Sequence, residues 1–186
     1  MDNLQLHCGR PENGEGRAPE EMRTYDLLES LGIPYDRVDH EAAFTMEACL
    51  YIDRALGTRM CKNLMLCNRQ MTRFYLLMMP GDKPFRTKEL SAQIGSARLS
   101  FAPEEKMVAY LGVHPGSVTV LGLMNDPDGI VELLVDREVL EDETLGCHPC
   151  VNTSSIRMRT RDLLEVFLPA VRHVPRFVEL GKPAKA

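Results

Sequence analysis

The sequence predicts an α+β domain with a mixed, mainly antiparallel sheet or a partly closed barrel, flanked by helices. Three observations support this class. Apolar residues recur at helical spacing in some segments and form alternating or continuous runs of strand length in others. A short polar connection joins two of the apolar runs, which is typical of an antiparallel hairpin. Other runs are separated by helical segments, so the strands are connected in both ways.

The chain has 186 residues, the length of one ordinary domain, which we assign to residues 19–182. Residues 1–18 are rich in Gly, Glu and Pro and poor in apolar anchors, which predicts a disordered arm. No charged-then-apolar leader opens the chain, and no apolar run approaches the ~20 residues that span a bilayer. Six cysteines without a secretory signal predict free thiols in a reducing, cytoplasmic compartment.

Turn and capping residues set the limits of the first predicted elements. Pro19 suits the first turn of a helix and Gly32 its left-handed end. Thr45 caps a second helix, which Gly57 ends, and the polar residues 68–71 connect the hairpin. In order, the elements are a helix over 20–31, an extended segment over 35–38, a helix over 45–56, and strands over 61–67 and 72–79.

Shorter helices and strands are predicted in the remainder of the chain. Pro103 at an opening position indicates a helix, and the Asn-Asp-Pro-Asp-Gly sequence of residues 125–129 is a turn between two strands. In order, the elements are a helix over 87–94, a strand over 99–101, a helix over 103–111, strands over 118–123 and 131–135, a strand leading to His148, a strand over 155–158, a helix over 161–168 and a closing strand over 173–178.

The formal net charge of −5 conceals an alternation along the chain. Residues 54–98 contain nine basic and two acidic side chains, whereas residues 1–53 and 99–156 each carry a net charge of −8. The basic stretch is suited to a phosphate backbone, and the acidic segments disfavour indiscriminate coating of nucleic acid. A solvated surface without a binding role is the alternative interpretation.

Two polar elements stand out for their chemistry. Lys62 interrupts an apolar strand, where its ammonium must face solvent or be held by partners, and Asn63 is equally ambiguous. His148 and Pro149 lie just outside a predicted strand, in a segment that we interpret as the rim of a site. A histidine fixed in a turn without a catalytic role is the alternative.

The Cys147-His-Pro-Cys150 sequence also suggests a redox pair, or a zinc site together with Cys61 and Cys67. A reactive pair needs a helix amino end, but the following residues predict a turn and then a strand. The spacing of Cys61 and Cys67 is not that of a chelating knuckle. Both interpretations are therefore the weaker ones.

In their order along the chain, several motifs resemble those of the YbaK/aminoacyl-tRNA synthetase-associated editing domains, specifically the freestanding prolyl-tRNA editing deacylases. The likeness spans about residues 22–180. The motifs are Leu31-Gly32-Ile33-Pro34-Tyr35, Asp39-His40, Phe44-Thr45-Met46-Glu47, Cys61-Lys62-Asn63-Leu64, Tyr75-Leu76, Arg98-Leu99-Ser100-Phe101-Ala102, Leu111-Gly112-Val113, Pro115-Gly116-Ser117-Val118-Thr119, Gly122-Leu123-Met124-Asn125, and His148-Pro149 with Asn152-Thr153.

The resemblance implies an enzyme that hydrolyses the ester between a wrong amino acid and tRNA, with Ala-tRNA(Pro) as the expected substrate. It carries over four catalytic residues, which are Lys62, Asn63, Gly116 and His148. The expected substrate-binding residues are Ser117, Val118, Cys147, Pro149 and Asn152. Cys61 and Cys147 are expected to form the pocket wall, without a covalent nucleophile. The resemblance implies no metal ion and no cofactor.

The implied partner is the acceptor end of mischarged tRNA, and prolyl-tRNA synthetase is a candidate second partner. The resemblance implies binding to neither a membrane nor DNA.

Three positions depart from the family pattern. Val120 stands where a proline usually closes the glycine loop. Cys147 stands where an apolar residue commonly precedes the His-Pro pair. Arg86 replaces an acidic residue that is often found before Thr87. Two other functions stay open: a non-catalytic module that binds aminoacyl-tRNA or a synthetase, and a thiol or zinc protein that uses Cys147 and Cys150.

Overall fold

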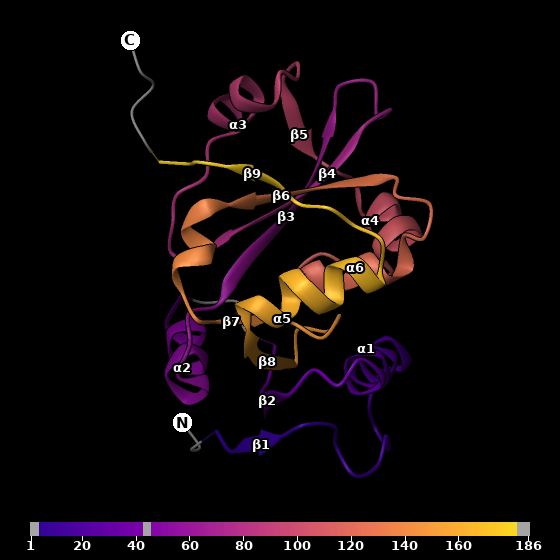
Figure 1. The fold of residues 1–186 in the computed structure, drawn as a ribbon, viewed down its shortest axis with the longest axis vertical. Coiled ribbons are helices and arrows are strands. Elements are labelled where there is room, and N and C mark those ends of the chain that lie inside the picture. Colours follow the sequence, from indigo (N-terminus) through magenta and orange to yellow (C-terminus); the bar gives the residue numbers. More distant parts are fainter. Residues whose placement is uncertain (1–3, 43–45, 182–186) are drawn as a thin grey trace.

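The computed structural model describes residues 4–42 and 46–181, which form an α+β fold with two sheets (Figure 1). The fold class predicted from the sequence is confirmed. One sheet has the strand order β1-β2-β8-β7 and is antiparallel throughout. The other has the order β5-β3-β4-β6-β9 and combines antiparallel pairs with the parallel pairs β4–β6 and β6–β9. The strands are β1 (Leu6–Cys8), β2 (Tyr35–Asp39), β3 (Cys61–Asn68), β4 (Phe74–Pro80), β5 (Leu99–Phe101), β6 (Val131–Asp136), β7 (Thr144–Cys147), β8 (Ser154–Arg159) and β9 (Arg176–Val178).

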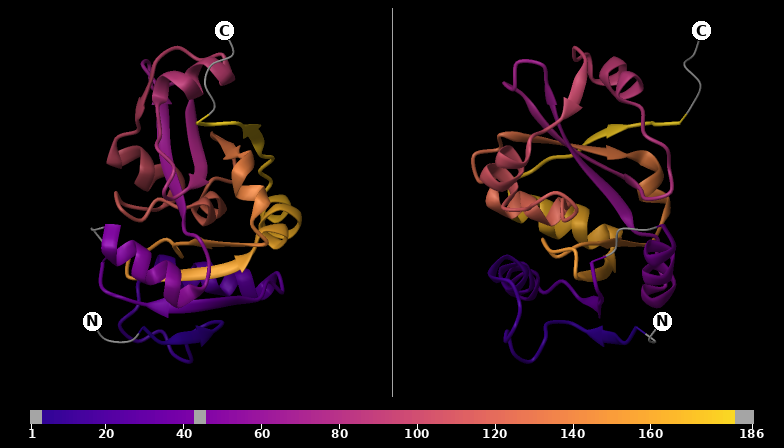
Figure 2. Two further views of the ribbon diagram at one scale, coloured as in Figure 1. Left: turned by 90° about the vertical axis from the view of Figure 1, so that its left-hand side faces the viewer. Right: turned by 180° about the vertical axis from the view of Figure 1, so that it is seen from behind.

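Helices cover the sheets and fill the space between them (Figures 1 and 2). The helical segment from α5 to α6 lies between the two sheets, with a π-helical stretch in its middle. The α-helices are α1 (Pro19–Ser30), α2 (Met46–Leu56), α3 (Thr87–Ile94), α4 (Glu104–Leu111), α5 (Thr160–Asp162) and α6 (Leu168–Ala170), and the π-helical stretch is Leu163–Phe167. The Thr45 cap predicted for α2 lies outside the described residues. No helix in the described ranges combines the length and apolar character needed to cross a membrane.

The segment before α1 differs from the predicted disordered arm. Strand β1 pairs with β2 in an antiparallel register that sets Leu6 opposite Val38. Ion pairs join the segment to the fold, with Arg10 Nε 2.8 Å from Asp26 and Arg17 contacting both Glu21 and Asp39. Composition missed this because the stabilising partners lie elsewhere in the chain.

The β3–β4 hairpin follows the sequence prediction closely. Asn68 ends β3, and its side-chain oxygen accepts hydrogen bonds from the backbone N–H groups of Thr72 and Arg73 at 2.9 and 3.1 Å. Met71 adopts the left-handed conformation with φ 51°, which the tight connection requires. The polar connection therefore fixes the register that sets Lys62 opposite Met79.

The predicted strand over residues 118–123 is wrong. Residues Val120–Asn125 form a 3-10 helix, and the Thr119 hydroxyl accepts a hydrogen bond from the Leu121 N–H. Gly122 packs against Leu111, where an added Cβ would lie 3.0 Å from the Leu111 carbonyl oxygen. A short apolar run that is buried on all sides has no periodicity to separate a strand from a buried helical turn. A second 3-10 helix, Arg137–Glu141, was not predicted, and the strand expected over 173–178 is limited to Arg176–Val178.

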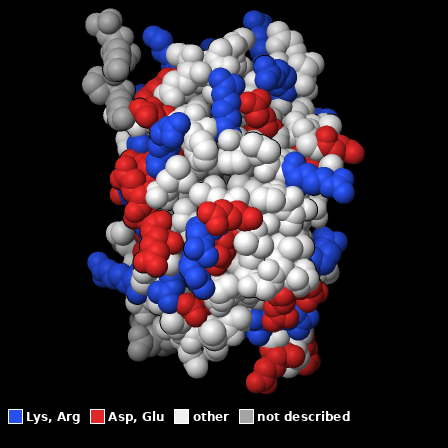
Figure 3. All heavy atoms as spheres, in the orientation of Figure 1, with Lys and Arg blue, Asp and Glu red and all other residues white. Residues whose placement is uncertain are grey.

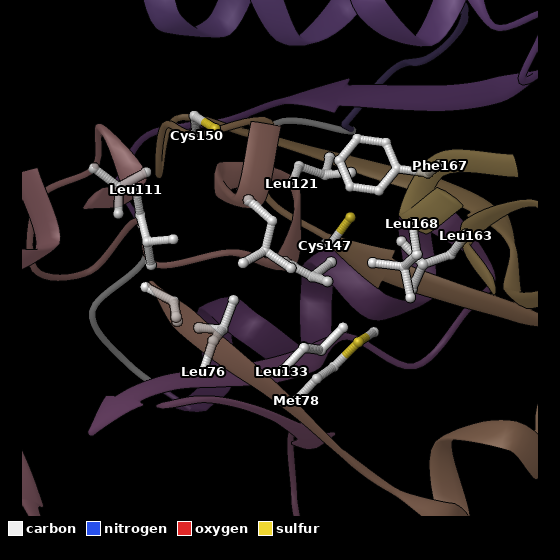
Figure 4. Close-up of a cluster of buried hydrophobic side chains, with 14 of the residues drawn as sticks. Leu76, Met78, Leu111, Leu121, Leu133, Cys147, Cys150, Leu163, Phe167 and Leu168 are labelled. Carbon is white, nitrogen blue, oxygen red and sulfur yellow. The ribbon is translucent and has the colours of Figure 1, made fainter. Parts of the chain in front are cut away.

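The main core lies between the two sheets and around the α5–α6 segment. Figure 4 shows Leu76, Met78 and Leu133 of the five-stranded sheet facing Leu121, Cys147 and Phe167. A second cluster lies on the other face of that sheet, under α3. On the face that Figure 3 shows, basic and acidic side chains lie interspersed. Three of the nine cations in the basic stretch are paired, since Arg59, Arg73 and Lys83 each contact carboxylates.

Candidate active site

A cavity of about 350 Å³ lies beside the first half of β3. All four residues predicted to be catalytic line it, together with Val118 from the predicted binding set. Its lining residues are Cys61, Lys62, Asn63, Leu64, Met65, Phe101, Met107, Pro115, Gly116, Val118 and His148. The structure therefore brings together residues that are up to 86 positions apart in the sequence, since Lys62 and His148 share one cavity.

A single parallel bridge explains why these two residues meet. Met60 bridges Gly146 in parallel, and the Gly146 N–H donates to the Arg59 carbonyl at 3.0 Å. Lys62 lies two residues after Met60, and His148 lies two residues after Gly146, so the bridge brings the two residues near each other. The contact is close, since a Cβ on Gly146 would lie 2.4 Å from the Met60 sulfur and 3.2 Å from its Cα, so a larger residue would have to displace the Met60 side chain.

The cavity occupies an open edge of the sheet. Strand β5 pairs with β3 only over Leu66–Asn68, and the Ala102 N–H donates to the Met65 carbonyl at 2.9 Å. Within the described residues, Lys62–Leu64 therefore has no strand partner on this side, between the Met60–Gly146 bridge and the pairing with β5. Backbone groups alternate in direction along a strand, so the N–H and C=O of Asn63 face the same edge as the Met65 carbonyl. These groups are placed to bind a ligand in the cavity.

Lys62 is held by a backbone group, and its charge interacts with the Asp82 carboxylate beyond ion-pair distance. Its Nζ donates to the carbonyl oxygen of Lys83 at 3.0 Å, and it makes no ion pair with any described residue. Lys83 is itself anchored, with its Nζ 2.6 Å from Asp136 Oδ2 and 2.8 Å from Glu138 Oε2. Lys62 lines the cavity, and the bond to the Lys83 carbonyl fixes the position of its ammonium, a charge that can attract an anionic oxygen.

Asn63 presents an unused acceptor. Its side-chain Oδ1 is buried and receives no hydrogen bond from the described residues, while its Nδ2 donates to the Cys61 carbonyl at 3.4 Å. A buried polar atom without a partner costs about 1–3 kcal/mol. A ligand that donates a hydrogen bond, such as an amine, would remove this cost.

The neutral tautomer of His148 follows from its partners. Its Nδ1 lies 3.1 Å from the Ser154 carbonyl oxygen, which can only accept, so Nδ1 carries the proton and Nε2 is left as an acceptor. Burial lowers the pKa of His148 below its ordinary value, and the nearby His40 lowers it further. A neutral imidazole with a free lone pair on Nε2 is suited to accept a proton.

The loop over residues 114–118 forms the facing wall. Gly116 has φ +90°, a conformation that favours glycine, and the Ser117 N–H closes the turn on the His114 carbonyl at 3.0 Å. A Cβ built on Gly116 would lie 3.5 Å from the Asn152 side-chain nitrogen, so Asn152 packs against this loop.

Four of the predicted binding residues do not line the cavity, and these are Ser117, Cys147, Pro149 and Asn152. Cys147 is fully buried and belongs to the core, as Figure 4 shows, so it lies behind the wall. The Ser117 hydroxyl is used within the turn, where it donates to the His114 carbonyl. Sequence reasoning did not identify five lining residues, Leu64, Met65, Phe101, Met107 and Pro115, because apolar side chains carry no signal that separates a cavity wall from a core.

The thiols near the site stay protonated at neutral pH. Burial raises the pKa of Cys61 to about 12 and that of Cys150 to about 11, and it also raises the pKa of Cys147. All six cysteines are free. Among the described residues, no three His, Cys, Asp or Glu side chains gather closely enough to hold a metal ion.

Comparison with known proteins identifies the family of the chain. A family model described as the aminoacyl-tRNA editing domain matches residues 40–166. The prolyl-tRNA editing protein ProX of Acetoanaerobium sticklandii is 30% identical over 139 residues, which cover 75% of this chain and 85% of that protein. The prolyl-tRNA synthetase associated domain-containing protein 1 of Danio rerio is 30% identical over 180 residues, covering 94% and 97% of the two chains.

A solved structure also shares the fold. A protein described as a candidate trans-editing enzyme for prolyl tRNA synthetase superposes with a TM-score of 0.64 at 16% identity, over 88% of this chain and 99% of that one. The family model covers more than half of the chain, and the residues that it spans include Lys62, Gly116 and His148 of the cavity. The chain therefore belongs to the aminoacyl-tRNA editing domain family.

Proposed function

We propose that this chain is a trans-editing deacylase that hydrolyses mischarged tRNA(Pro), with Ala-tRNA(Pro) as its main substrate. The name of the ProX relative supports prolyl-tRNA editing, and the names of the other relatives support prolyl-tRNA synthetase as a partner. A synthetase pocket built for proline cannot strongly exclude a smaller apolar side chain. A second site that accepts only the smaller acyl group removes such errors.

One observation carries the proposal. Three polar residues line a cavity of about 350 Å³, namely Lys62, Asn63 and His148, and the Asn63 Oδ1 receives no hydrogen bond from the described residues. An aminoacyl ester of tRNA offers a cationic amine, an ester carbonyl and an anionic backbone. Asn63 Oδ1 can accept from the amine, Lys62 can attract the anionic backbone, and the loop N–H groups at Gly116 can donate to the carbonyl, while His148 can accept a proton.

In the proposed reaction the Asn63 Oδ1 accepts a hydrogen bond from the substrate ammonium, and Lys62 meets the anionic nucleotide. Backbone N–H groups of the loop at Gly116 donate to the ester carbonyl oxygen. A water molecule attacks the carbonyl carbon and gives a proton to His148 Nε2, with assistance from the neighbouring ribose hydroxyl. The tetrahedral intermediate then releases alanine, and the departing ribose oxygen takes the proton. No covalent enzyme intermediate forms.

Deacylation assays with Lys62→Ala test this function. Wild-type protein is expected to release alanine from Ala-tRNA(Pro), and the variant to do so about 10²-fold more slowly, since an oriented charge in a recessed site contributes on this scale. Arg161→Ala, which removes an exposed cation of α5, is the matched control and should leave the rate unchanged. Equal rates for Lys62→Ala and wild type would refute the site.

A panel of mischarged tRNAs tests the specificity. Alanyl-tRNA(Pro) should be cleared faster than correctly charged prolyl-tRNA(Pro), because the proline ring must also fit against Met65, Met107 and Val118. Binding of Ala-tRNA(Pro) without turnover would instead favour a non-catalytic recognition module.

A further inference from the structure

Phe101 is an exposed aromatic side chain at the rim of the cavity. It ends β5 and lines the cavity, yet its side chain is 60% exposed. The ring of Phe85 contacts it at a centroid distance of 6.4 Å and an interplanar angle of 67°. The Phe101 ring is therefore held by an aromatic neighbour while much of its surface stays open to a ligand that enters the cavity.

Three cations that make no ion pair with a described residue lie on the segments next to this ring. Arg86 directly follows Phe85, Lys88 lies in the first turn of α3, and Arg98 directly precedes β5. All three are exposed, and none makes an ion pair with a described residue. Helix α3 packs beside β5 at the same end of the five-stranded sheet, as the view from behind in Figure 2 shows. We name Phe101 and these three cations the β5 rim.

The pairing of charges elsewhere makes the β5 rim distinctive. Arg59 contacts Asp82 and Glu138, and Arg73 contacts Glu132. Carboxylates therefore neutralise three cations of the basic stretch, and three of those that make no ion pair with a described residue belong to the rim. Positive charge beside an exposed aromatic ring is the combination that binds single-stranded nucleic acid, because bases stack on the ring and phosphates meet the cations.

We propose that the β5 rim binds the single-stranded 3′ end of tRNA, with a base of that end stacked on Phe101 and the adjoining phosphates near Arg86, Lys88 and Arg98. This inference rests on the proposed function, because the nucleotide carrying the ester must lie at the mouth of the cavity. Phe101 is the aromatic residue of the cavity lining, so a terminal base has a stacking surface within reach of the reacting ester. Stacking on a ring tolerates any base, so the rim contributes affinity for an RNA end and the cavity selects the acyl group.

Fluorescence of a base analogue tests the stacking directly. The probe is an uncharged RNA hairpin that ends in single-stranded CCA, with 2-aminopurine in place of the terminal adenine or, in a second probe, of the cytosine before it. Stacking on Phe101 is expected to change the fluorescence of at least one probe in wild type and in Phe101→Tyr. In Phe101→Leu the change should disappear and Kd should rise about 10-fold.

Phe177→Leu is the matched control. Phe177 lies in β9, at the opposite edge of the same sheet, and is 37% exposed under the Arg137 guanidinium. This variant should behave as wild type does. An unchanged signal and Kd in Phe101→Leu, or no binding of either probe by the wild-type protein, would overturn the inference.

The salt dependence of binding tests the cations. Each phosphate contact that is lost lowers the slope of log Kd against log salt by about 0.7 for a single strand. Lys88→Gln and Arg98→Gln should each show this loss, whereas Arg161→Gln, an exposed residue paired with Glu165, should not. Parallel slopes for all variants would contradict a phosphate contact at the rim.

The two proposals fail in different ways. Probe binding and Phe101-dependent fluorescence without deacylation would refute the enzyme and keep the RNA site. If Phe101→Leu deacylates with the same KM as wild type and gives the same fluorescence signal, the deacylase function stands. RNA binding at the β5 rim is then refuted.

Discussion

His40 and His148 are linked through a single hydroxyl group. His40 Nε2 lies 2.9 Å from Ser155 Oγ, which lies 3.3 Å from His148 Nδ1. His40 Nδ1 lies 2.8 Å from the Glu41 carbonyl oxygen, so in the neutral ring this nitrogen donates and Nε2 accepts. The Ser155 hydroxyl therefore donates to His40 and accepts from His148. This direction of bonding leaves the His148 Nε2 lone pair for the cavity.

Ser155→Ala should weaken catalysis through His148. The substitution keeps the Ser154 carbonyl as a partner but removes the hydroxyl, so the ring loses part of its orientation and His40 loses a donor. We expect deacylation to slow about 10-fold and the free energy of unfolding to fall by about 1–2 kcal/mol. Single-turnover rates and urea unfolding measure the two effects. Ser155→Thr, which retains a hydroxyl, should recover most of the rate, and a failure to recover it would argue against the linkage.

The two histidines should make stability fall in mildly acidic solution. Burial lowers the pKa of both His40 and His148 from the ordinary value of 6.5, although Asp39 partly offsets the effect at His40. Below pH 6.5 the unfolded chain binds protons that the folded protein resists, so the free energy of unfolding decreases until the folded pKa values are reached. Urea titrations at several pH values measure this slope. His148→Gln should reduce it, and an unchanged slope would contradict the assignment.

Gly116→Ala should impair turnover more than stability. The φ of +90° disfavours any residue with a Cβ, at a cost of about 1–2 kcal/mol, and relief of this strain moves the loop N–H groups. We expect the deacylation rate to fall at least about 10-fold. Gly129→Ala is the control, since Gly129 has φ +65° and open space around its Cβ position. We expect the two variants to lose similar stability and only Gly116→Ala to lose activity. Equal activities of the two variants would contradict a role of the Gly116 loop in turnover.

Cys61→Ala should keep the deacylase active. The Cys61 thiol lines the cavity, but burial raises its pKa to about 12, so little thiolate exists at neutral pH to act as a nucleophile. We expect a rate within about threefold of wild type, since the change only enlarges the cavity. Iodoacetamide should modify the exposed Cys8 and Cys49 first and leave activity intact. Abolition of activity by Cys61→Ala would indicate covalent catalysis.

Lys83→Met should destabilise the fold. Its Nζ pairs with Asp136, a residue that is only 1% exposed. Loss of the cation leaves the buried carboxylate without its ion-pair partner, with the Glu138 N–H still donating to Oδ1 at 3.2 Å. We expect the free energy of unfolding to fall by about 3 kcal/mol. Arg73→Met breaks a more exposed pair with Glu132 and should cost less than about 1 kcal/mol. Urea unfolding of the two variants should differ accordingly, and equal losses would show that burial of the Lys83 pair is immaterial.

Elements with local signals could be predicted from the sequence. The hairpin of β3 and β4 has a polar connection between two apolar runs, and Gly32 marks the end of α1. The convergence of Lys62 and His148 was anticipated from a family resemblance, and the structure places both at one cavity. Their catalytic roles stay predictions.

Features that depend on distant partners could not be predicted. The pairing of β1 requires the exposed edge of β2, and the helical turn of Val120–Asn125 is set by its burial against α4. Exposure of Phe101 follows from where β5 ends, and the role of Ser155 depends on two histidines 108 residues apart. No local pattern carries this information, because each feature arises from tertiary contacts.

The open edge of β3 also bears on self-association. An unpaired strand edge is a template on which another polypeptide can add a strand, the first step towards aggregation. A charged side chain on such a strand opposes this addition, because pairing would bury the charge. Lys62 thus protects the chain from intermolecular β-pairing at the same place where the open backbone is needed for a ligand, and a neutral residue there would leave the edge available to a second molecule.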